Sequence, residues 1–188
     1  MKRVFIVHGW GGSPKEAWFP WLKKELEQKG YSVTVPSMPD SEEPVIEKWV
    51  SHLSKTVGEP NEETYFVGHS IGCQTIMRYL ASTNKKVGGC VFVGGWFTLS
   101  ELETSEEKTI AKPWLQTSID FSAIKKTTKK IIAIFSDDDP YVPLENVKMF
   151  EKNLQAKTII EHSKGHMGGE SKTFKLQSAL DSVLKITS

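Results

Sequence analysis

Short runs of apolar residues alternate with longer amphipathic stretches along this chain. The short runs are rich in β-branched and aromatic residues, and most of them end at Gly, Pro, Ser or His, which is typical of strands. They predict strands at residues 4–7, 31–35, 65–67, 90–93, 131–135 and 158–160. Because the runs are apolar without alternation, we expect both faces of these strands to be buried, as in a parallel sheet.

The longer stretches carry apolar residues at helical spacing. Between residues 45 and 57 an apolar residue recurs at every fourth position and forms one stripe on a helix. Similar stripes predict helices over residues 21–29, 73–80, 143–153 and 176–184. Strands that alternate with helices in this way predict an α/β fold, a three-layer α/β/α sandwich around a doubly wound, six-stranded parallel sheet with right-handed crossovers.

One segment interrupts this alternation. Residues 96–120 separate the fourth predicted strand from the fifth, and large apolar side chains lie among their charges without a strand pattern. We interpret the segment as a small helical insertion over the carboxyl edge of the sheet, where such folds bind ligands, and therefore as a lid. The alternative is an ordinary crossover helix with irregular ends. The length suits a single domain, residues 1–188, with this insertion inside it.

The charges of the chain are balanced. With 24 basic and 23 acidic residues the formal net charge is +1, which argues against nucleic acid or an anionic membrane as the main partner. No stretch approaches the roughly 18 apolar residues of a membrane span, and the first apolar run stops at His8, too early for a signal peptide. Cys73 and Cys90 form neither a disulfide framework nor a metal site, so we expect buried thiols in a reducing cytoplasm.

A serine lies between the third predicted strand and the helix after it. Residues 68–72 read G-H-S-I-G, the pattern of a nucleophile elbow. In such a sharp turn the residues two positions before and after Ser70 must lack side chains, because their Cβ atoms would collide. The turn lifts the hydroxyl clear of the sheet, at a helix N-terminus that favours negative charge. The pattern alone is common by chance, so other residues have to support it.

A serine hydroxyl needs a base that removes its proton, and the base needs an acid that orients it. Both residue types follow Ser70 at the ends of later predicted strands. Three aspartates at residues 137–139 come after the fifth strand, and His162 and His166 come after the sixth. In this order, at strand ends, the three residue types predict a serine nucleophile with its acid and base.

The choice among the three aspartates depends on geometry. Asp139 lies three residues beyond Ser136, the first residue after the strand, and Pro140 fixes the loop behind it. A carboxylate at that reach can turn toward the histidine, which favours Asp139 as the acid. Asp137 and Asp138 would then be solvated or would cap the turn before the next helix. The prolines nearby and the irregular ligand spacing argue against a metal site.

Among the histidines, His166 is the predicted base. It lies in a glycine-rich loop that is able to point the ring back to the sheet edge. His162 lies at the strand end, where we expect a structural role. His69 lies inside the elbow, and we expect its side chain to point away from the Ser70 hydroxyl.

Acyl transfer also needs donors for the negative charge that develops on the carbonyl oxygen. We expect one donor to be the Ile71 amide at the start of the elbow helix, and the other the Trp10 amide in the loop at residues 8–13. A dinucleotide-binding loop is the alternative. Residues 9–14 lack the last glycine of G-x-G-x-x-G, however, and Trp10 would crowd a pyrophosphate.

Three of the tryptophans fall in segments that should border the site. Trp10, Trp96 and Trp114 would wall an apolar acyl pocket there. Ordinary packing is the alternative for each of them.

These motifs resemble the small serine hydrolases of the α/β-hydrolase superfamily, the family typified by YdeN and retinoblastoma-binding protein 9. The matching pieces are V-H-G-W-G-G at residues 7–12, G-H-S-I-G at 68–72, D-D-P-Y-V-P at 138–143 and G-H at 165–166, and they span nearly the whole chain. The resemblance implies a minimal α/β-hydrolase fold that lacks the first two strands of larger relatives. It also implies Ser70 as nucleophile, His166 as base and Asp139, the aspartate before the proline, as acid.

The primary hypothesis is a cytoplasmic serine hydrolase that cleaves a small-molecule carboxylic ester with a short or medium acyl group through an acyl-enzyme. We expect neither a metal nor an organic cofactor. One alternative is the same triad acting as an amidase, thioesterase or acyltransferase. Another is a protein-interaction module with weak catalysis and a protein partner. The complete constellation argues against this module, which would not need a nucleophile, base, acid and oxyanion donors together.

Overall fold

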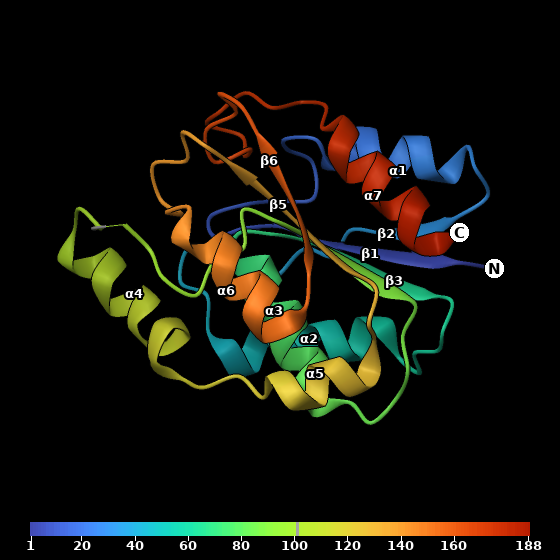
Figure 1. The fold of residues 1–188 in the computed structure, drawn as a ribbon. Coiled ribbons are helices and arrows are strands. Elements are labelled where there is room, and N and C mark those ends of the chain that lie inside the picture. The colour runs from blue at the N-terminus through green and yellow to red at the C-terminus, as the bar shows by residue number, and fades with distance from the viewer. Residues whose placement is uncertain (101) are drawn as a thin grey trace.

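A parallel sheet of six strands crosses the centre of the molecule (Figure 1). The computed structural model describes residues 1–100 and 102–188. The strand order is β2-β1-β3-β4-β5-β6, and every neighbouring pair is parallel. The bounds are β1 Arg3–Val7, β2 Ser32–Thr34, β3 Thr64–His69, β4 Gly89–Val93, β5 Ile131–Ser136 and β6 Lys157–Glu161.

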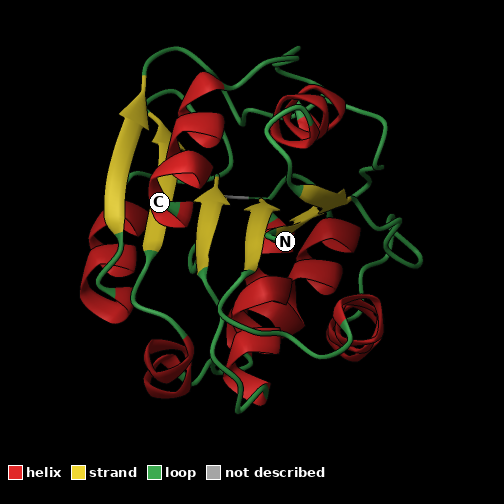
Figure 2. Cartoon of the chain, turned by 90° about the vertical axis from the view of Figure 1, so that its right-hand side faces the viewer, coloured by secondary structure: helices red, strands yellow, loops and turns green. Residues whose placement is uncertain are grey.

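Helices cover both faces of the sheet (Figure 1 and Figure 2). Their bounds are α1 Phe19–Glu27, α2 Ile46–Val57, α3 Ile71–Ser82, α4 Ser105–Gln116, α5 Phe121–Thr127, α6 Glu145–Leu154 and α7 Gln177–Thr187. Helices α1 and α7 pack on one face, and α2, α3, α5 and α6 pack on the other. The predicted α/β/α sandwich is therefore confirmed. None of the helices in the described ranges has the length and apolar character that crossing a membrane requires.

The alternation of side chains along each strand explains the continuous apolar runs. In β1, Val4 and Ile6 pack in the core beneath α1 and α7, whereas Phe5 and Val7 pack in the core beneath α2 and α3. The central strands β3, β4 and β5 are buried along their whole length. The prediction of double burial is wrong for β6, because this edge strand has β5 as its one neighbour and its Ile160 is 44% exposed.

The segment between β4 and α5 contains one helix, α4, among its described residues. A capping box begins this helix: the Thr104 side chain accepts from the Glu107 amide, and the Glu107 carboxylate accepts from the Thr104 amide. This helix lies within the insertion predicted at residues 96–120, and residue 101 lies outside the described residues.

Candidate active site

Ser70 lies at the turn between β3 and α3, in a strained backbone conformation. Its φ is 53° and its ψ is −123°. This backbone conformation is energetically unfavourable for any residue that has a side chain. A Cβ at Gly68 would lie 2.8 Å from the Cys73 amide nitrogen, and a Cβ at Gly72 would lie 2.6 Å from the His8 carbonyl oxygen. The absence of side chains at both positions is thus a steric requirement of the turn.

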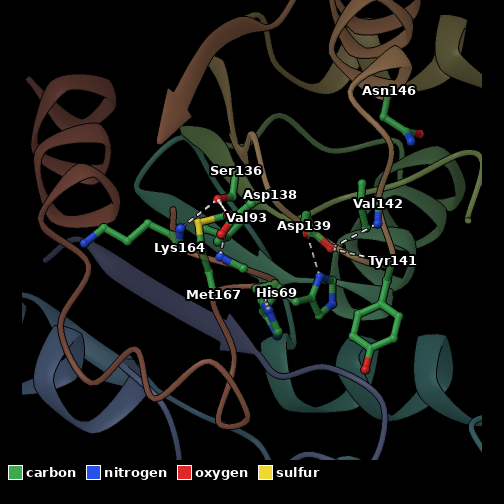
Figure 3. A network of polar contacts seen from close by, with 12 residues as sticks. His69, Val93, Ser136, Asp138, Asp139, Tyr141, Val142, Asn146, Lys164 and Met167 are labelled. Atoms are coloured by element: carbon green, nitrogen blue, oxygen red, sulfur yellow. Dashed lines mark hydrogen bonds and ion pairs between the residues drawn. The ribbon is translucent and has the colours of Figure 1, made fainter. Parts of the chain in front are cut away.

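Asp139 and His166 form a hydrogen-bonded pair at the carboxyl ends of β5 and β6 (Figure 3). Nδ1 of His166 lies 2.8 Å from Oδ2 of Asp139, whose side chain is only 1% exposed. The other oxygen, Oδ1, accepts from the amides of Tyr141 and Val142 at 2.9 and 3.0 Å. Because a carboxylate only accepts, the ring carries its proton on Nδ1, and Nε2 of the neutral imidazole keeps a free lone pair.

A cleft of about 450 Å³ brings Ser70 and His166 together at the carboxyl edge of the sheet. Trp96, Leu99 and Tyr141 contribute to its wall. Among the described residues no hydrogen bond joins the Ser70 hydroxyl to the His166 ring. In free enzymes such contacts are commonly long and shorten when substrate binds.

The residues predicted to supply oxyanion donors line the same cleft. Ile71 is the first residue of α3, so its amide has no partner within the helix. Trp10 lies in the loop after β1, and its indole Nε1 donates to the Glu42 carbonyl oxygen at 2.8 Å. Among the described residues neither amide donates to a backbone carbonyl in the turns and loops.

Comparison with known proteins now assigns the chain to a family. The family model described as "Serine hydrolase" matches residues 4–183. The chain belongs to the serine hydrolase family. It is 34% identical to YdeN of Bacillus subtilis (strain 168) over 168 residues, which cover 88% of this chain and 85% of YdeN. It is 29% identical to the serine hydrolase RBBP9 of Rattus norvegicus over 170 residues, which cover 87% of this chain and 86% of RBBP9.

Solved structures share the fold of this chain. The crystal structure of the ydeN gene product from B. subtilis matches with a TM-score of 0.90 at 29% identity, over 99% of this chain and 98% of that one. Est1E from Butyrivibrio proteoclasticus, in a structure with ferulic acid bound, matches with a TM-score of 0.74 at 16% identity, over 98% of this chain and 90% of that one. The predicted family and α/β-hydrolase fold are confirmed, and the protein is a hydrolase.

A second histidine packs directly against His166 in this serine hydrolase. Nε2 of the buried His69 lies 2.8 Å from the His166 carbonyl oxygen, and the two rings are 4.9 Å apart. The rings of Trp18 and Phe19 also pack near His69, with ring centroids 6.3 and 6.0 Å from that of His69. Burial and the nearby His166 lower the pKa of His69 to about 3, so its ring stays neutral and donates to the carbonyl. The prediction that His69 would merely point away from the Ser70 hydroxyl missed this role.

Asp138 braces the loop that carries His166. Its Oδ1 accepts from the Ser136 hydroxyl at 2.7 Å and from the Gly165 amide at 2.8 Å (Figure 3). These two hydrogen bonds, the one from Ser136 first, lower the pKa of the Asp138 carboxyl. Because Gly165 directly precedes His166, this contact fixes the backbone from which the histidine side chain projects.

Asp137 ties the same two loops together at the surface. Its carboxylate lies 2.6 Å from Nδ1 of the exposed His162 and accepts from the Ser163 amide at 2.9 Å. The hydrogen bond between Asp137 and His162 lowers the pKa of the Asp137 carboxyl and raises the pKa of the His162 ring. Asp137 and Asp138 are both exposed, so the prediction that they would be solvated is confirmed, while the alternative that they cap the turn before α6 is wrong. Asp139 caps that turn instead, because its Oδ1 faces the amides that follow Pro140.

The loop that carries Trp10 is anchored by the buried His8. Nε2 of His8 accepts from the Met38 amide at 3.0 Å, so Nδ1 carries the proton and donates to the Gly9 carbonyl oxygen at 2.8 Å. Burial lowers the pKa of His8, which keeps this neutral tautomer. The sequence motif V-H-G-W thus contains an anchor as well as an expected oxyanion donor.

Two of the three tryptophans predicted to wall the pocket, Trp10 and Trp96, line the cleft. The prediction is wrong for Trp114, which is 1% exposed and donates from Nε1 to the Pro44 carbonyl oxygen at 2.9 Å. Helix α4 presents its first turn, with Glu107, to the cleft and its last turns to the core. Trp114 therefore packs in the core although it belongs to the insertion.

The cleft is acidic. Glu16, Glu42, Glu107 and Glu170 line it, and none of the described lining residues is Lys or Arg. No ion pair among the described residues includes any of these four carboxylates. Glu170 accepts from the Tyr141 hydroxyl at 3.1 Å, and burial together with this hydrogen bond raises the pKa of Tyr141. A ligand therefore enters a region of negative potential.

Proposed function

We propose that this serine hydrolase is an esterase that hydrolyses a small carboxylic ester with a short or medium acyl group through Ser70, His166 and Asp139. The observation that carries the proposal is the buried hydrogen bond between Asp139 and His166, in the same cleft as the strained Ser70. A histidine held in this tautomer is suited to accept a proton on Nε2. The carboxylate would also stabilise the imidazolium that forms.

In the proposed reaction the Ser70 oxygen attacks the ester carbonyl carbon while Nε2 of His166 takes the hydroxyl proton. The amides of Trp10 and Ile71 stabilise the resulting oxyanion. When the intermediate collapses, His166 returns the proton to the leaving oxygen, the alcohol departs and the acyl group stays on Ser70. His166 then takes a proton from water, which attacks the acyl-enzyme, and the second collapse releases the acid and restores the serine hydroxyl.

The character of the cleft supports an ester of modest size. Its volume of about 450 Å³ is partly walled by Trp10 and Leu99, which offer apolar surface to an acyl chain. The four glutamates nearby favour neutral or cationic substrates over anionic ones. Est1E, whose structure was solved with ferulic acid bound, shares the fold, and this adds fold-level support only.

The insertion at residues 96–120 would act as a lid within a single domain of residues 1–188. Leu99, Leu102 and Glu107 reach the cleft from this segment. Its helix α4 has only two buried residues, so it has little apolar contact to hold it in place. The free, buried thiols of Cys73 and Cys90 support a reducing cytoplasm as the working compartment.

The test is a panel of p-nitrophenyl esters with rising acyl-chain length. We expect wild type to hydrolyse them with a preferred length, Ser70→Ala to lose activity by about four orders of magnitude, and Ser54→Ala, on the outer surface of α2, to match wild type. Equal rates for wild type and Ser70→Ala would contradict the nucleophile. A response that is flat in chain length would contradict the acyl pocket.

A further inference from the structure

Arg78 is a buried cation in helix α3, two turns beyond Ser70. Its residue is 8% exposed, and among the described ion pairs no carboxylate accompanies it. A buried guanidinium is costly unless hydrogen bonds compensate for the lost water. Its Nε has no partner among the described groups, so compensation has to come from the two Nη atoms.

The Nη atoms of Arg78 point at the end of α4. Nη2 donates to the carbonyl oxygens of Trp114 and Thr117 at 3.0 and 2.9 Å, and Nη1 donates to that of Ser118 at 3.4 Å. The guanidinium also lies over the Trp114 ring, 5.8 Å from its centroid. Carbonyls at a helix C-terminus have no partners within the helix and carry negative partial charge, so a cation is favoured there. Arg78 therefore clamps the C-terminal end of the insertion helix to α3.

A second contact connects Arg78 with the start of the insertion. Nη2 donates to Oε1 of Gln74, one turn earlier on α3, at 3.2 Å. Nε2 of Gln74 in turn donates to the Trp96 carbonyl oxygen at 2.7 Å. Because Trp96 lines the cleft, this buried chain of hydrogen bonds reaches the wall of the substrate site. Both ends of the insertion thus bind to the helix that begins at the nucleophile.

Other contacts of α4 are few. Only Ala111 and Trp114 in this helix are buried, and Figure 1 shows the helix at the left, standing out from the other helices. Its first turn nevertheless places Glu107 in the cleft. The position of this wall therefore depends on how the other end of α4 is held, by the Arg78 clamp and by the Trp114 side chain, which donates to the Pro44 carbonyl oxygen.

We propose that Arg78 is a positioning residue for substrate binding, which acts with Gln74 to hold the insertion at residues 96–120 in the place where it forms one wall of the cleft. The inference rests on the proposed ester hydrolysis. Arg78 touches neither Ser70 nor His166, so its loss should weaken substrate binding more than it slows the chemical steps.

Arg3 provides a matched control. It donates to the carbonyl oxygens of Val57 and Glu59 at 3.0 and 2.7 Å, at the C-terminal end of α2, and to Oγ1 of Thr64 at 2.9 Å. It also lies 5.6 Å from the ring centroid of Phe5. This clamp has the same chemistry as that of Arg78, but it lies at the amino end of the sheet, away from the cleft.

The experiment compares Arg78→Lys with Arg3→Lys. Lysine keeps the positive charge but lacks the several N–H donors that the planar guanidinium holds in fixed directions. We expect Arg78→Lys to raise KM for a medium-chain p-nitrophenyl ester about tenfold and to change kcat less than about twofold. Hydrogen exchange of the amides at residues 105–116 should be at least about tenfold faster in Arg78→Lys. Arg3→Lys should leave KM and this exchange unchanged.

A second variant covers the case in which Arg78→Lys does not fold. Gln74→Met breaks the link to Trp96 and keeps the Arg78 bonds to α4, so we expect a rise in KM of about threefold with exchange in α4 unchanged. An unchanged KM in Gln74→Met would overturn the proposal, as would unchanged exchange in Arg78→Lys or equal effects of the two lysine variants on KM. If wild type hydrolyses no ester, the proposed function fails, while the exchange measurement still tests the clamp.

Discussion

The carboxylate of Asp139 has two tasks, one for each of its oxygens. Oδ2 holds the proton on Nδ1 of His166, and Oδ1 caps the turn through the amides of Tyr141 and Val142. An asparagine at this position can cap with its oxygen, but its amide nitrogen donates. The ring would then accept at Nδ1 and carry its proton on Nε2, where the base needs a lone pair.

We therefore expect Asp139→Asn to lower kcat by on the order of 10³–10⁴ with a folded protein and KM little changed. Asp137→Asn is the control, since Asp137 bonds to His162 and Ser163 at the surface, and it should keep kcat within about threefold. Steady-state ester hydrolysis measures both. A large loss in Asp137→Asn with a small one in Asp139→Asn would reassign the acid.

The neutral ring of His69 makes the stability of the fold depend on pH. Its pKa is about 3 in the folded protein, whereas an exposed histidine titrates near 6.5. As the pH falls below about 6.5, the unfolded chain takes up a proton at this position that the folded protein does not accept until about pH 3. The contribution of the neutral His69 ring to the stability of the fold is therefore complete above about pH 6.5 and is lost as the pH falls toward 3.

In His69→Gln the side chain does not titrate but still offers a donor to the His166 carbonyl. We expect the slope of the unfolding free energy between about pH 4 and pH 6 to fall by up to about 1.4 kcal/mol per pH unit relative to wild type. Urea unfolding across this range measures the slope. Identical slopes would show that His69 is protonated in the folded protein at these pH values.

At the scale of elements, the strand–turn–helix unit of β3 and α3 depends on space more than on backbone freedom. A Cβ at Gly72 would meet the carbonyl oxygens of Val7 and His8 at the end of β1, the next strand. Gly58, after α2, presents the opposite case: its φ is +63°, and the space that a Cβ would occupy is open, with no neighbouring atom within 4 Å.

We expect Gly72→Ala to destabilise the protein by more than about 3 kcal/mol, because backbone atoms have to move. Gly58→Ala should cost about 1–3 kcal/mol, the energy of a residue with a side chain in a sparsely populated backbone conformation. Urea midpoints compare the two variants. A smaller loss in Gly72→Ala than in Gly58→Ala would contradict the steric account of the elbow.

The elements were predictable where local patterns decide them. Continuous apolar runs reflect the burial of β3, β4 and β5, and apolar stripes at every fourth position reflect the burial of one face of each helix. Residues close together in the sequence determine both patterns. The exposure of Ile160 depends on strand order, since β6 lies at an edge. The burial of Trp114 depends on how α4 rotates against α2 and α3. Neither property has a local signal.

At the scale of the whole molecule, the four glutamates of the cleft, which form no ion pair among the described residues, should select substrates by charge. We expect kcat/KM for the mono-p-nitrophenyl ester of succinate to be at least about tenfold below that for p-nitrophenyl butyrate, which has no negative charge. Replacing Glu42 and Glu170 by glutamine should narrow this ratio, and so should added salt, which screens the charges. Glu62→Gln, remote from the cleft, should leave the ratio unchanged. A ratio near one in wild type would contradict electrostatic selection.

The residues of the candidate site were predictable from motifs, but the residues that hold them in position were not. Ser70, Asp139 and His166 stand out because glycines, a proline and chain order surround them, and the structure brings all three to one sheet edge. His69 and Arg78 carry no such signal. Their importance comes from partners distant in sequence, the His166 carbonyl and the end of α4, which only the folded chain brings near.

The central claim is that Ser70 is the nucleophile of this serine hydrolase. Reaction with a fluorophosphonate probe, followed by intact mass and peptide mapping, tests it most directly, because the probe bonds to an activated serine and requires no knowledge of the substrate. We predict a single adduct on Ser70 of the wild-type protein and none on Ser70→Ala. A folded wild-type protein that takes up no probe, or an adduct that persists in Ser70→Ala, would contradict the account.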